Sequence, residues 1–161
     1  MELTKLFTMQ RELDAYIQKK QFVNNDVFKE KGLALLVELA ELANETRCFK
    51  FWSSKGPSER KVILEEYVDS IHFLLSLGIE KGLDTLKVWP EGEVEGDLTS
   101  VFIQTISAIQ EFMMNTDKES YENIWIHYGA IANRIGISYI EIMSAYLEKN
   151  EENYKRQQTG Y

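Results

Sequence analysis

The feature that most constrains this chain is a long apolar segment, residues 32–52, that carries three glutamates. Its sequence is GLALLVELAELANETRCFKFW, and apolar residues fall on nearly every side of it, as in a buried helix. Spacings of three and four residues place Glu38, Glu41 and Glu45 on one helical face, within about 60°. Because a buried carboxylate is costly unless it is paired or bound to a metal, this segment favours a metal site.

A second apolar segment, residues 62–77, repeats the arrangement with Glu66 and Asp69. If the two helices pack side by side, these two carboxylates meet Glu38 and Glu41. Two like charges about 4 Å apart repel by roughly 4 kcal/mol at an effective dielectric near 20, so such a cluster needs a counter-charge. Oxygen ligands without a Cys or His cluster favour Mg²⁺, or Mn²⁺, over Zn²⁺. Since the same spacings are common on solvated helix faces, two exposed acidic faces stay open as the alternative at this point.

Helical periodicity runs through almost the whole chain, and strand-like alternation is absent. We therefore expect one all-α domain over residues 1–161, a helical bundle of about six helices. The expected helices cover about residues 2–20, 26–47, 58–81, 97–114, 117–134 and 138 into the tail. Five of them begin near residues suited to N-capping, and Ser138 forms a capping-box pattern with Glu141. The candidate caps are Asn24, Asn25 or Asp26 for the second helix, and Ser58, Asp97, Asp117 and Ser138 for the later ones.

Charge and composition exclude several classes of protein. The net charge of −8 argues against binding to a nucleic acid polymer, which needs clustered Lys and Arg. No apolar run reaches the roughly 18 residues needed to span a bilayer, and the charged N-terminus does not resemble a signal peptide. The lone Cys48 fits a reducing compartment. We therefore expect a cytoplasmic protein that does not act at a membrane.

Two further groups of side chains suit a phosphorylated ligand. Lys149, Asn153 and Arg156 share one face of the last helix, where Arg and Lys can meet phosphate oxygens. Taken alone, this pattern is more typical of a solvated helix of mixed charge. The second group follows the first acidic helix and combines aromatic rings for stacking on a base with lysines for phosphates: Phe49, Lys50, Phe51, Trp52 and Lys55. Its alternative is a helix end whose aromatic rings pack into the core.

His72 lies three residues after Asp69 and has two interpretations. It can orient the Asp69 carboxylate, or it can be a structural residue with its hydrogen bonds satisfied inside the fold. We favour the structural interpretation.

The segments ELAELANETRCFKFW, EEYVDSIHFLLSLG and KNEENYKRQQTGY together resemble the dimeric dUTPases, and the N-terminal helix with Gln10 also fits. These enzymes belong to the all-α, MazG-like NTP pyrophosphohydrolase superfamily. The E-x-x-E and E-x-x-D pairs are shared by the whole superfamily, whereas the run from Asn44 to Trp52 and the C-terminal tail are more specific for the dUTPase branch. The chain is short for that family and lacks the insertions that longer members carry between their later helices.

The resemblance implies a homodimer that hydrolyses dUTP to dUMP and pyrophosphate with Mg²⁺. It implies that a metal-activated water attacks phosphorus, with Glu38 or Glu41 helping to deprotonate it. The implied metal ligands are Glu38, Glu41, Glu66 and Asp69. Glu45 lies outside this four-residue signature and is a supplementary candidate only because it shares the helical face of Glu38 and Glu41. The implied phosphate or sugar contacts are Lys149, Asn153 and Arg156, and the implied base pocket contains Gln10, Trp52 and Phe73. Two alternatives stay open: hydrolysis of dCTP or of a modified or non-standard nucleotide, and a non-catalytic helical interaction protein.

Overall fold

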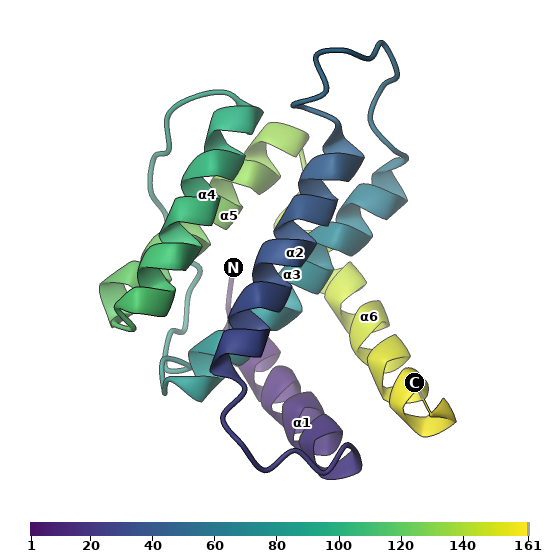
Figure 1. Ribbon diagram of the computed structural model, residues 1–161, viewed down its shortest axis with the longest axis vertical. Helices are drawn as coiled ribbons and strands as arrows, with labels where there is room; N and C mark the ends of the chain where they lie inside the picture. Colours follow the sequence, from purple (N-terminus) through teal and green to yellow (C-terminus); the bar gives the residue numbers. More distant parts are fainter. Residues whose placement is uncertain (161) are drawn as a thin grey trace.

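The computed structural model describes residues 1–160, and within them it contains six helices and no strand (Figure 1). The helices are α1 (Thr4–Lys20), α2 (Phe28–Thr46), α3 (Arg60–Glu80), α4 (Leu98–Met114), α5 (Lys118–Ile135) and α6 (Tyr139–Thr159). The expected all-α class and number of helices are confirmed. Tyr161, the last residue of the tail motif, lies outside the described residues.

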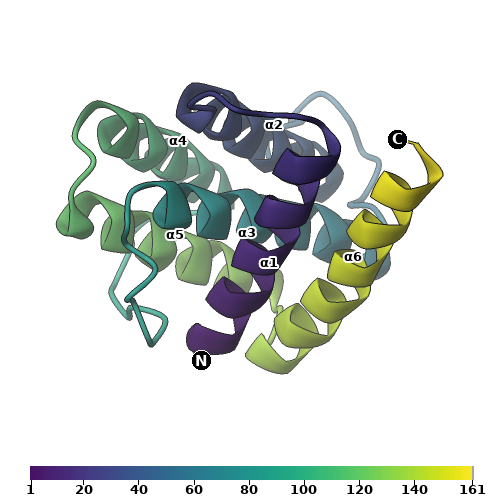
Figure 2. The same ribbon diagram turned by 90° about the horizontal axis from the view of Figure 1, so that it is seen from below.

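Helix α3 is the centre of the molecule. It packs against α2 along its length, and α1 and α6 both lie against it from another side (Figures 1 and 2). Helices α4 and α5 form a second pair, which joins the first through the contact of α4 with α2. Fully buried leucines fill the space between these helices, among them Leu35 and Leu39 of α2 and Leu74 and Leu75 of α3. Helices α1, α2 and α6 can therefore place side chains next to those of α3.

Three of the five predicted N-caps are confirmed. The prediction for the second helix is wrong, because α2 begins after Val27 and has no side-chain cap. The side chains of Asp97 and Asp117 accept hydrogen bonds from the backbone N–H groups three residues later, and Ser138 forms a capping box with Glu141. The prediction for Ser58 is wrong, because α3 begins after Glu59 and has no side-chain cap. The hydroxyl of Ser58 instead donates to the carboxylate of Glu45, a charged acceptor that forms a stronger hydrogen bond.

The connection between α3 and α4 has no regular structure, yet part of it belongs to the core. Trp89 is buried, and its indole N–H donates to the carbonyl oxygen of Trp125 at 2.9 Å. Its backbone N–H donates to Met1 O at 2.9 Å, and Leu3 N donates to Lys87 O at 2.8 Å. These hydrogen bonds hold the N-terminal residues, and with them the start of α1, against the rest of the chain.

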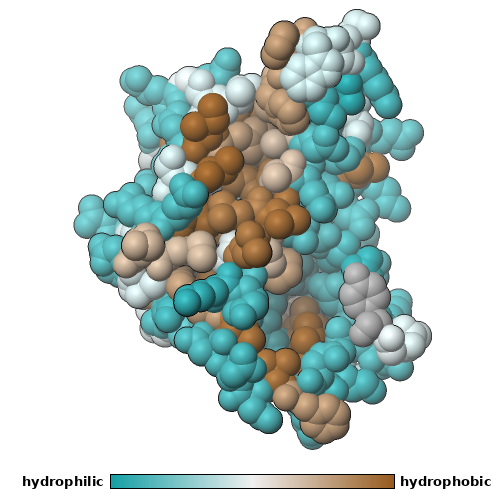
Figure 3. Space-filling view, in the orientation of Figure 1, coloured by the Kyte–Doolittle hydropathy of each residue, from teal (hydrophilic) through white to brown (hydrophobic). Residues whose placement is uncertain are grey.

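One apolar surface extends over α2 and α4 (Figure 3). Leu33 and Val37 of α2 are 62% and 46% exposed, and Ile103 of α4 is 61% exposed. The prediction that α2 is buried on nearly every side is therefore wrong for the chain alone, because no other helix covers this side of α2. None of the described helices is long and apolar enough to cross a bilayer, and the cytoplasmic location stays a prediction.

Candidate metal and nucleotide site

Three of the four predicted metal ligands converge between α2 and α3. Glu38 of α2 and Glu66 and Asp69 of α3 each place a carboxylate oxygen within 4.8 Å of the other two. All three side chains are partly buried. The spacing of three residues puts Glu66 and Asp69 one turn apart on the face of α3 that meets α2.

Glu41 and Glu45 lie at the edge of this carboxylate cluster. Glu41 is exposed, but it is close enough for its charge to raise the pKa of both Glu38 and Glu66. Glu45 accepts the hydrogen bond of Ser58 and contributes only a small part of the effect on Glu66. Neither residue belongs to the compact group of three, so their contribution to metal binding stays a prediction.

The electrostatics of the cluster favour a bound cation. Burial raises the pKa of Glu38 to about 7, and the charges of Asp69 and Glu41 add to the increase. Burial likewise raises the pKa of Glu66 to about 7, followed by the charges of Glu41 and Asp69. The carboxylates thus repel one another, and the charge of Lys149, which lowers the pKa of Glu38, does not offset this repulsion. A set of oxygen donors with this excess of negative charge fits Mg²⁺, a hard cation that prefers carboxylate ligands.

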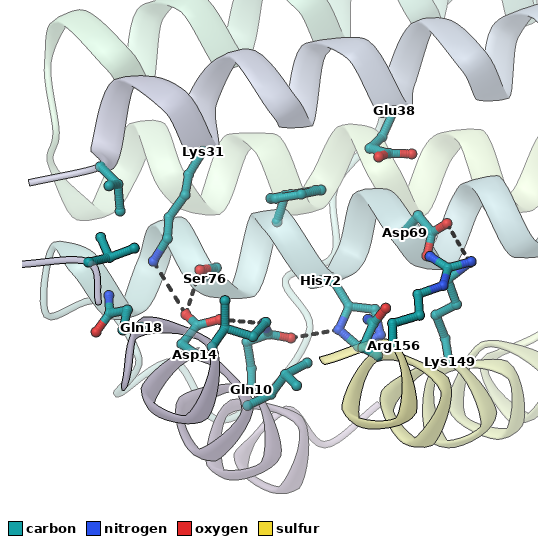
Figure 4. Close-up of a pocket in the computed structure, with 16 residues that line it drawn as sticks. Gln10, Asp14, Gln18, Lys31, Glu38, Asp69, His72, Ser76, Lys149 and Arg156 are labelled. Carbon is teal, nitrogen blue, oxygen red and sulfur yellow. Dashed lines mark hydrogen bonds and ion pairs between the residues drawn. The ribbon is translucent and has the colours of Figure 1, made fainter. Parts of the chain in front are cut away.

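Helix α6 brings the predicted basic face to the same place. Lys149 is buried, and its Nζ lies 2.8 Å from Asp69 Oδ2 and 2.9 Å from Glu65 Oε1. Burial acts to lower the pKa of Lys149, but the hydrogen bonds to Asp69 and Glu65 outweigh it and raise that pKa. Asn153 and Arg156 lie further along the same face and line the adjoining cavity. Figure 4 shows Arg156 beside Lys149. The geometry therefore places positive charge next to the carboxylate cluster.

A cavity of about 370 Å³ extends from the cluster toward α1, a volume typical of small-molecule sites. At one end it is lined by Glu38, Asp69 and Lys149 (Figure 4). Gln10, predicted to bind the base, lies toward the other end, and Phe73, predicted to do the same, also lines the cavity. One elongated site thus joins the carboxylate cluster and Lys149 to a second group of polar side chains near α1.

The structure does not bring Trp52, Lys50 and Lys55 to this cavity within a single chain. Trp52 is 65% exposed, and its ring contacts Phe49 and Phe51 instead. The cause is local, because α2 ends at Arg47 in the left-handed conformation, with φ of 57°. The Arg47 side chain then donates hydrogen bonds to Lys55 O and Ser53 Oγ, which stabilise the loop in this conformation.

A second polar cluster in the cavity was missed by the sequence analysis. Asp14 accepts hydrogen bonds from Gln10 and Ser76, and it pairs with Lys31 (Figure 4). His72 lies 2.7 Å from the Gln10 side-chain oxygen. Two signals were available: Asp14 follows Gln10 by four residues, which places both on one helical face, and Ser76 interrupts an apolar run.

Comparison with known proteins identifies the family of the chain. A family model described as dUTPase matches residues 2–161. A search of curated proteins found no match. Because the family match spans nearly the whole sequence, the chain belongs to the all-α dimeric dUTPase family and is a dUTP diphosphatase.

Proposed function

We propose that this protein hydrolyses dUTP to dUMP and pyrophosphate in a Mg²⁺-dependent reaction in the cavity between α1, α2, α3 and α6. The observation that carries the proposal is the position of the carboxylate cluster beside Lys149, at one end of a cavity large enough for a small ligand. Family membership supplies dUTP hydrolysis in general. The cluster supports the dependence on metal and the position of the triphosphate.

Glu38, Glu66 and Asp69 would hold Mg²⁺, with Glu41 completing the set from its exposed edge. Mn²⁺ has similar ligand preferences and fits the same oxygen donors. When bound, the metal would neutralise charge on the polyphosphate and lower the pKa of a bound water. Glu38 and Glu41 of α2 are the candidates to accept the proton of the attacking water, as the resemblance to the dimeric dUTPases implies.

The remaining residues bind and orient the substrate. Lys149, Asn153 and Arg156 would contact phosphate or sugar groups, with Lys149 acting as a compact charge and Arg156 as a planar fork of donors. Gln10 and Phe73 would contact the base, Gln10 through its amide and Phe73 by stacking. The negative net charge of the chain argues for a nucleotide rather than a nucleic acid polymer as ligand.

A second copy of this chain would cover the apolar surface on α2 and α4. Its exposed side chains include Leu33, Val37 and Ile103, and contiguous apolar patches of this kind mark interaction sites. The family to which the chain belongs is dimeric. Burial against an identical surface also explains why α2 carries apolar residues on nearly every side.

The deciding experiment is a hydrolysis panel of deoxynucleoside triphosphates, read by release of pyrophosphate, with Mg²⁺ or with EDTA. We expect dUTP to be hydrolysed fastest and only with metal.

Glu66→Gln should reduce turnover by at least about 100-fold, because loss of a direct ligand costs more than loss of an outer partner. Glu111→Gln, an exposed change on α4, is the matched control. Preference for dCTP would overturn the assignment of the base.

Thermal melts separate loss of the metal site from loss of the fold. A ligand present at 100 times its dissociation constant stabilises a protein by about 2.7 kcal/mol. Mg²⁺ should therefore raise the Tm of the wild-type protein but not that of Glu66→Gln, while helical circular dichroism stays the same. A non-catalytic helical interaction protein, the alternative from the sequence, would show neither a shift with Mg²⁺ nor turnover.

A further inference from the structure

Asp69 lies between two groups of charged side chains. On one side, a carboxylate oxygen of Asp69 lies within 4.8 Å of an oxygen of Glu38 and of Glu66. On the other side, Asp69 Oδ2 lies 2.8 Å from Lys149 Nζ (Figure 4). The side chain of Lys149 is only 7% exposed, so its charge is held inside the protein. One carboxylate therefore belongs both to the proposed metal site and to an ion pair with a buried ammonium group.

The periodicity of α3 produces this arrangement. Glu65 and Glu66 are neighbours in the sequence, so they point about 100° apart around the helix. Glu66 faces α2, where it meets Glu38. Glu65 faces α6, where its Oε1 lies 2.9 Å from Lys149 Nζ. Asp69 lies one turn later and between these two directions, about 40° from Glu65 and about 60° from Glu66. Helix α3 thus presents one acidic edge to the metal site and another to Lys149.

Glu65 helps to hold Lys149 in place, although it is not one of the three clustered carboxylates. A lysine ammonium group has three N–H donors, and two carboxylates, those of Asp69 and Glu65, lie within hydrogen-bond distance of it. Glu152 Oε2 is 3.9 Å away, which is too far for a hydrogen bond. A further anion can therefore join Lys149 without breaking either of the two short contacts. Lys149 also lines the cavity, where a phosphate would be such an anion.

The position of Lys149 has opposite consequences for a metal ion and for a phosphate. A positive charge beside Asp69 repels a divalent cation that binds the same carboxylate, and the repulsion is larger in a partly buried site than in water. A phosphate group next to Lys149 carries negative charge, so it offsets the charge of the lysine and weakens this repulsion. The metal and the nucleotide should therefore bind more tightly together than either does alone.

We propose that Lys149, held in place by Glu65, couples the binding of metal to the binding of nucleotide. Without nucleotide, the lysine lowers the affinity of the carboxylate cluster for Mg²⁺, and a phosphate that pairs with the lysine removes this opposition. The inference rests on the proposed function, in which Glu38, Glu66 and Asp69 bind the metal. Glu65 is a positioning residue in this scheme, because it acts through Lys149. Coupling of this kind is reciprocal, so Mg²⁺ raises the affinity for nucleotide by the same factor.

The first test measures Mg²⁺ binding without nucleotide, by isothermal titration calorimetry. Lys149→Met removes the charge and keeps an unbranched side chain. We expect this variant to bind Mg²⁺ at least about tenfold more tightly than the wild-type chain, because the repulsion is gone. A lysine with a merely structural role would give the opposite result, since its loss would disturb Asp69 and weaken metal binding. Equal or weaker affinity in a folded Lys149→Met would therefore overturn the proposal.

Glu65→Gln should change the same affinity in the opposite direction. With Glu65 neutral, the charge of Lys149 is offset by Asp69 alone among its two short contacts, so Mg²⁺ binding should weaken at least about threefold. Glu148→Gln is the matched control, because it removes the same charge from an exposed residue of α6 that forms no ion pair with Lys149 within residues 1–160. If Lys149→Met does not fold, this pair decides: wild-type affinity in Glu65→Gln would contradict the proposal.

The coupling itself is measured with a dUTP analogue that carries an imido group between the α- and β-phosphates and is not hydrolysed there. The quantity is the dissociation constant of Mg²⁺ without the analogue divided by that with it, corrected for Mg²⁺ bound to free analogue. This ratio should be at least about tenfold smaller in Lys149→Met than in the wild-type chain. Direct contact between metal and phosphate is present in both proteins, so its contribution cancels.

The outcomes separate this inference from the proposed function. Equal ratios in the two proteins, with Mg²⁺ bound in both, would contradict the role of Lys149 and leave the metal-dependent reaction standing. If the wild-type chain binds no Mg²⁺ even with the analogue, the metal site of the proposed function is wrong, and the coupling is wrong with it.

Discussion

At the scale of single residues, the state of the cavity depends on which protons its buried groups carry. His72 illustrates this, because its hydrogen bond goes to Gln10 and not to Asp69. The structural interpretation of this residue from the sequence agrees with its burial. However, His72 Nε2 has no hydrogen-bond partner within residues 1–160. In a buried histidine with a purely structural role, both ring nitrogens are normally hydrogen-bonded.

Substituting His72 should change how stability depends on pH. Folding lowers the pKa of His72 from 6.5 to about 3, so between these values the unfolded chain binds a proton that the folded chain excludes. The contribution of neutral His72 to the free energy of unfolding is therefore complete above about pH 6.5 and is lost as the pH falls toward 3.

The measurement is urea denaturation of the wild-type chain and His72→Gln at several pH values between 7 and 4. We expect the difference in free energy of unfolding between the two proteins to shrink as the pH is lowered. The carboxylates of Glu38 and Glu66 titrate in both proteins, so their effect cancels in this difference. Two parallel curves would show that His72 is protonated equally in the folded and unfolded states.

At the scale of helices, two glycines allow close packing between neighbouring helices. Gly78 of α3 lies directly against Tyr121 of α5, and a Cβ at position 78 would be 2.5 Å from Tyr121 Cζ. Gly32 of α2 lies against Met113 of α4, where a Cβ would be 2.7 Å from Sδ. Tyr121 is buried and donates to Leu74 O at 2.9 Å, whereas Met113 is a flexible side chain.

These two glycines should therefore respond differently to alanine. Gly78→Ala should destabilise the fold, since overpacking costs about 1–3 kcal/mol and helix propensity returns only about 1 kcal/mol. In Gly32→Ala the methionine can move, so the net change should stay within about 1 kcal/mol of zero. Urea denaturation of both variants measures this. Equal destabilisation would mean that Tyr121 moves as easily as Met113.

The helix scale also explains why only one glutamate of the first pair enters the cluster. Three residues along a helix rotate the side chain by about 60° from the first position. Glu38 faces α3, and Glu41 is turned toward solvent. The spacing predicted that both carboxylates lie on one face. It did not fix where α3 crosses that face.

At the scale of the whole molecule, the apolar surface over α2 and α4 should mediate dimerisation. Ile103 is an exposed residue of this surface, so Ile103→Glu would place a charge in the dimer interface. We expect this variant to be a monomer, which sedimentation velocity detects. Ile140→Glu is the matched control, because Ile140 is exposed on α6 and lies beside Met143, away from this surface. A monomeric wild-type chain, or dissociation only in Ile140→Glu, would place the interface elsewhere.

The sequence by itself determined the helices, the N-caps of the last three and the spacing of the acidic residues, because these features depend on contacts within a few residues along the chain. The tertiary structure alone decided which side chains share the cavity. It placed Trp52 outside by the turn at Arg47, buried Trp89 against α5, and joined Gln10 to His72 and Tyr146. Such contacts join distant segments, so they follow from how helices pack and not from their periodicity.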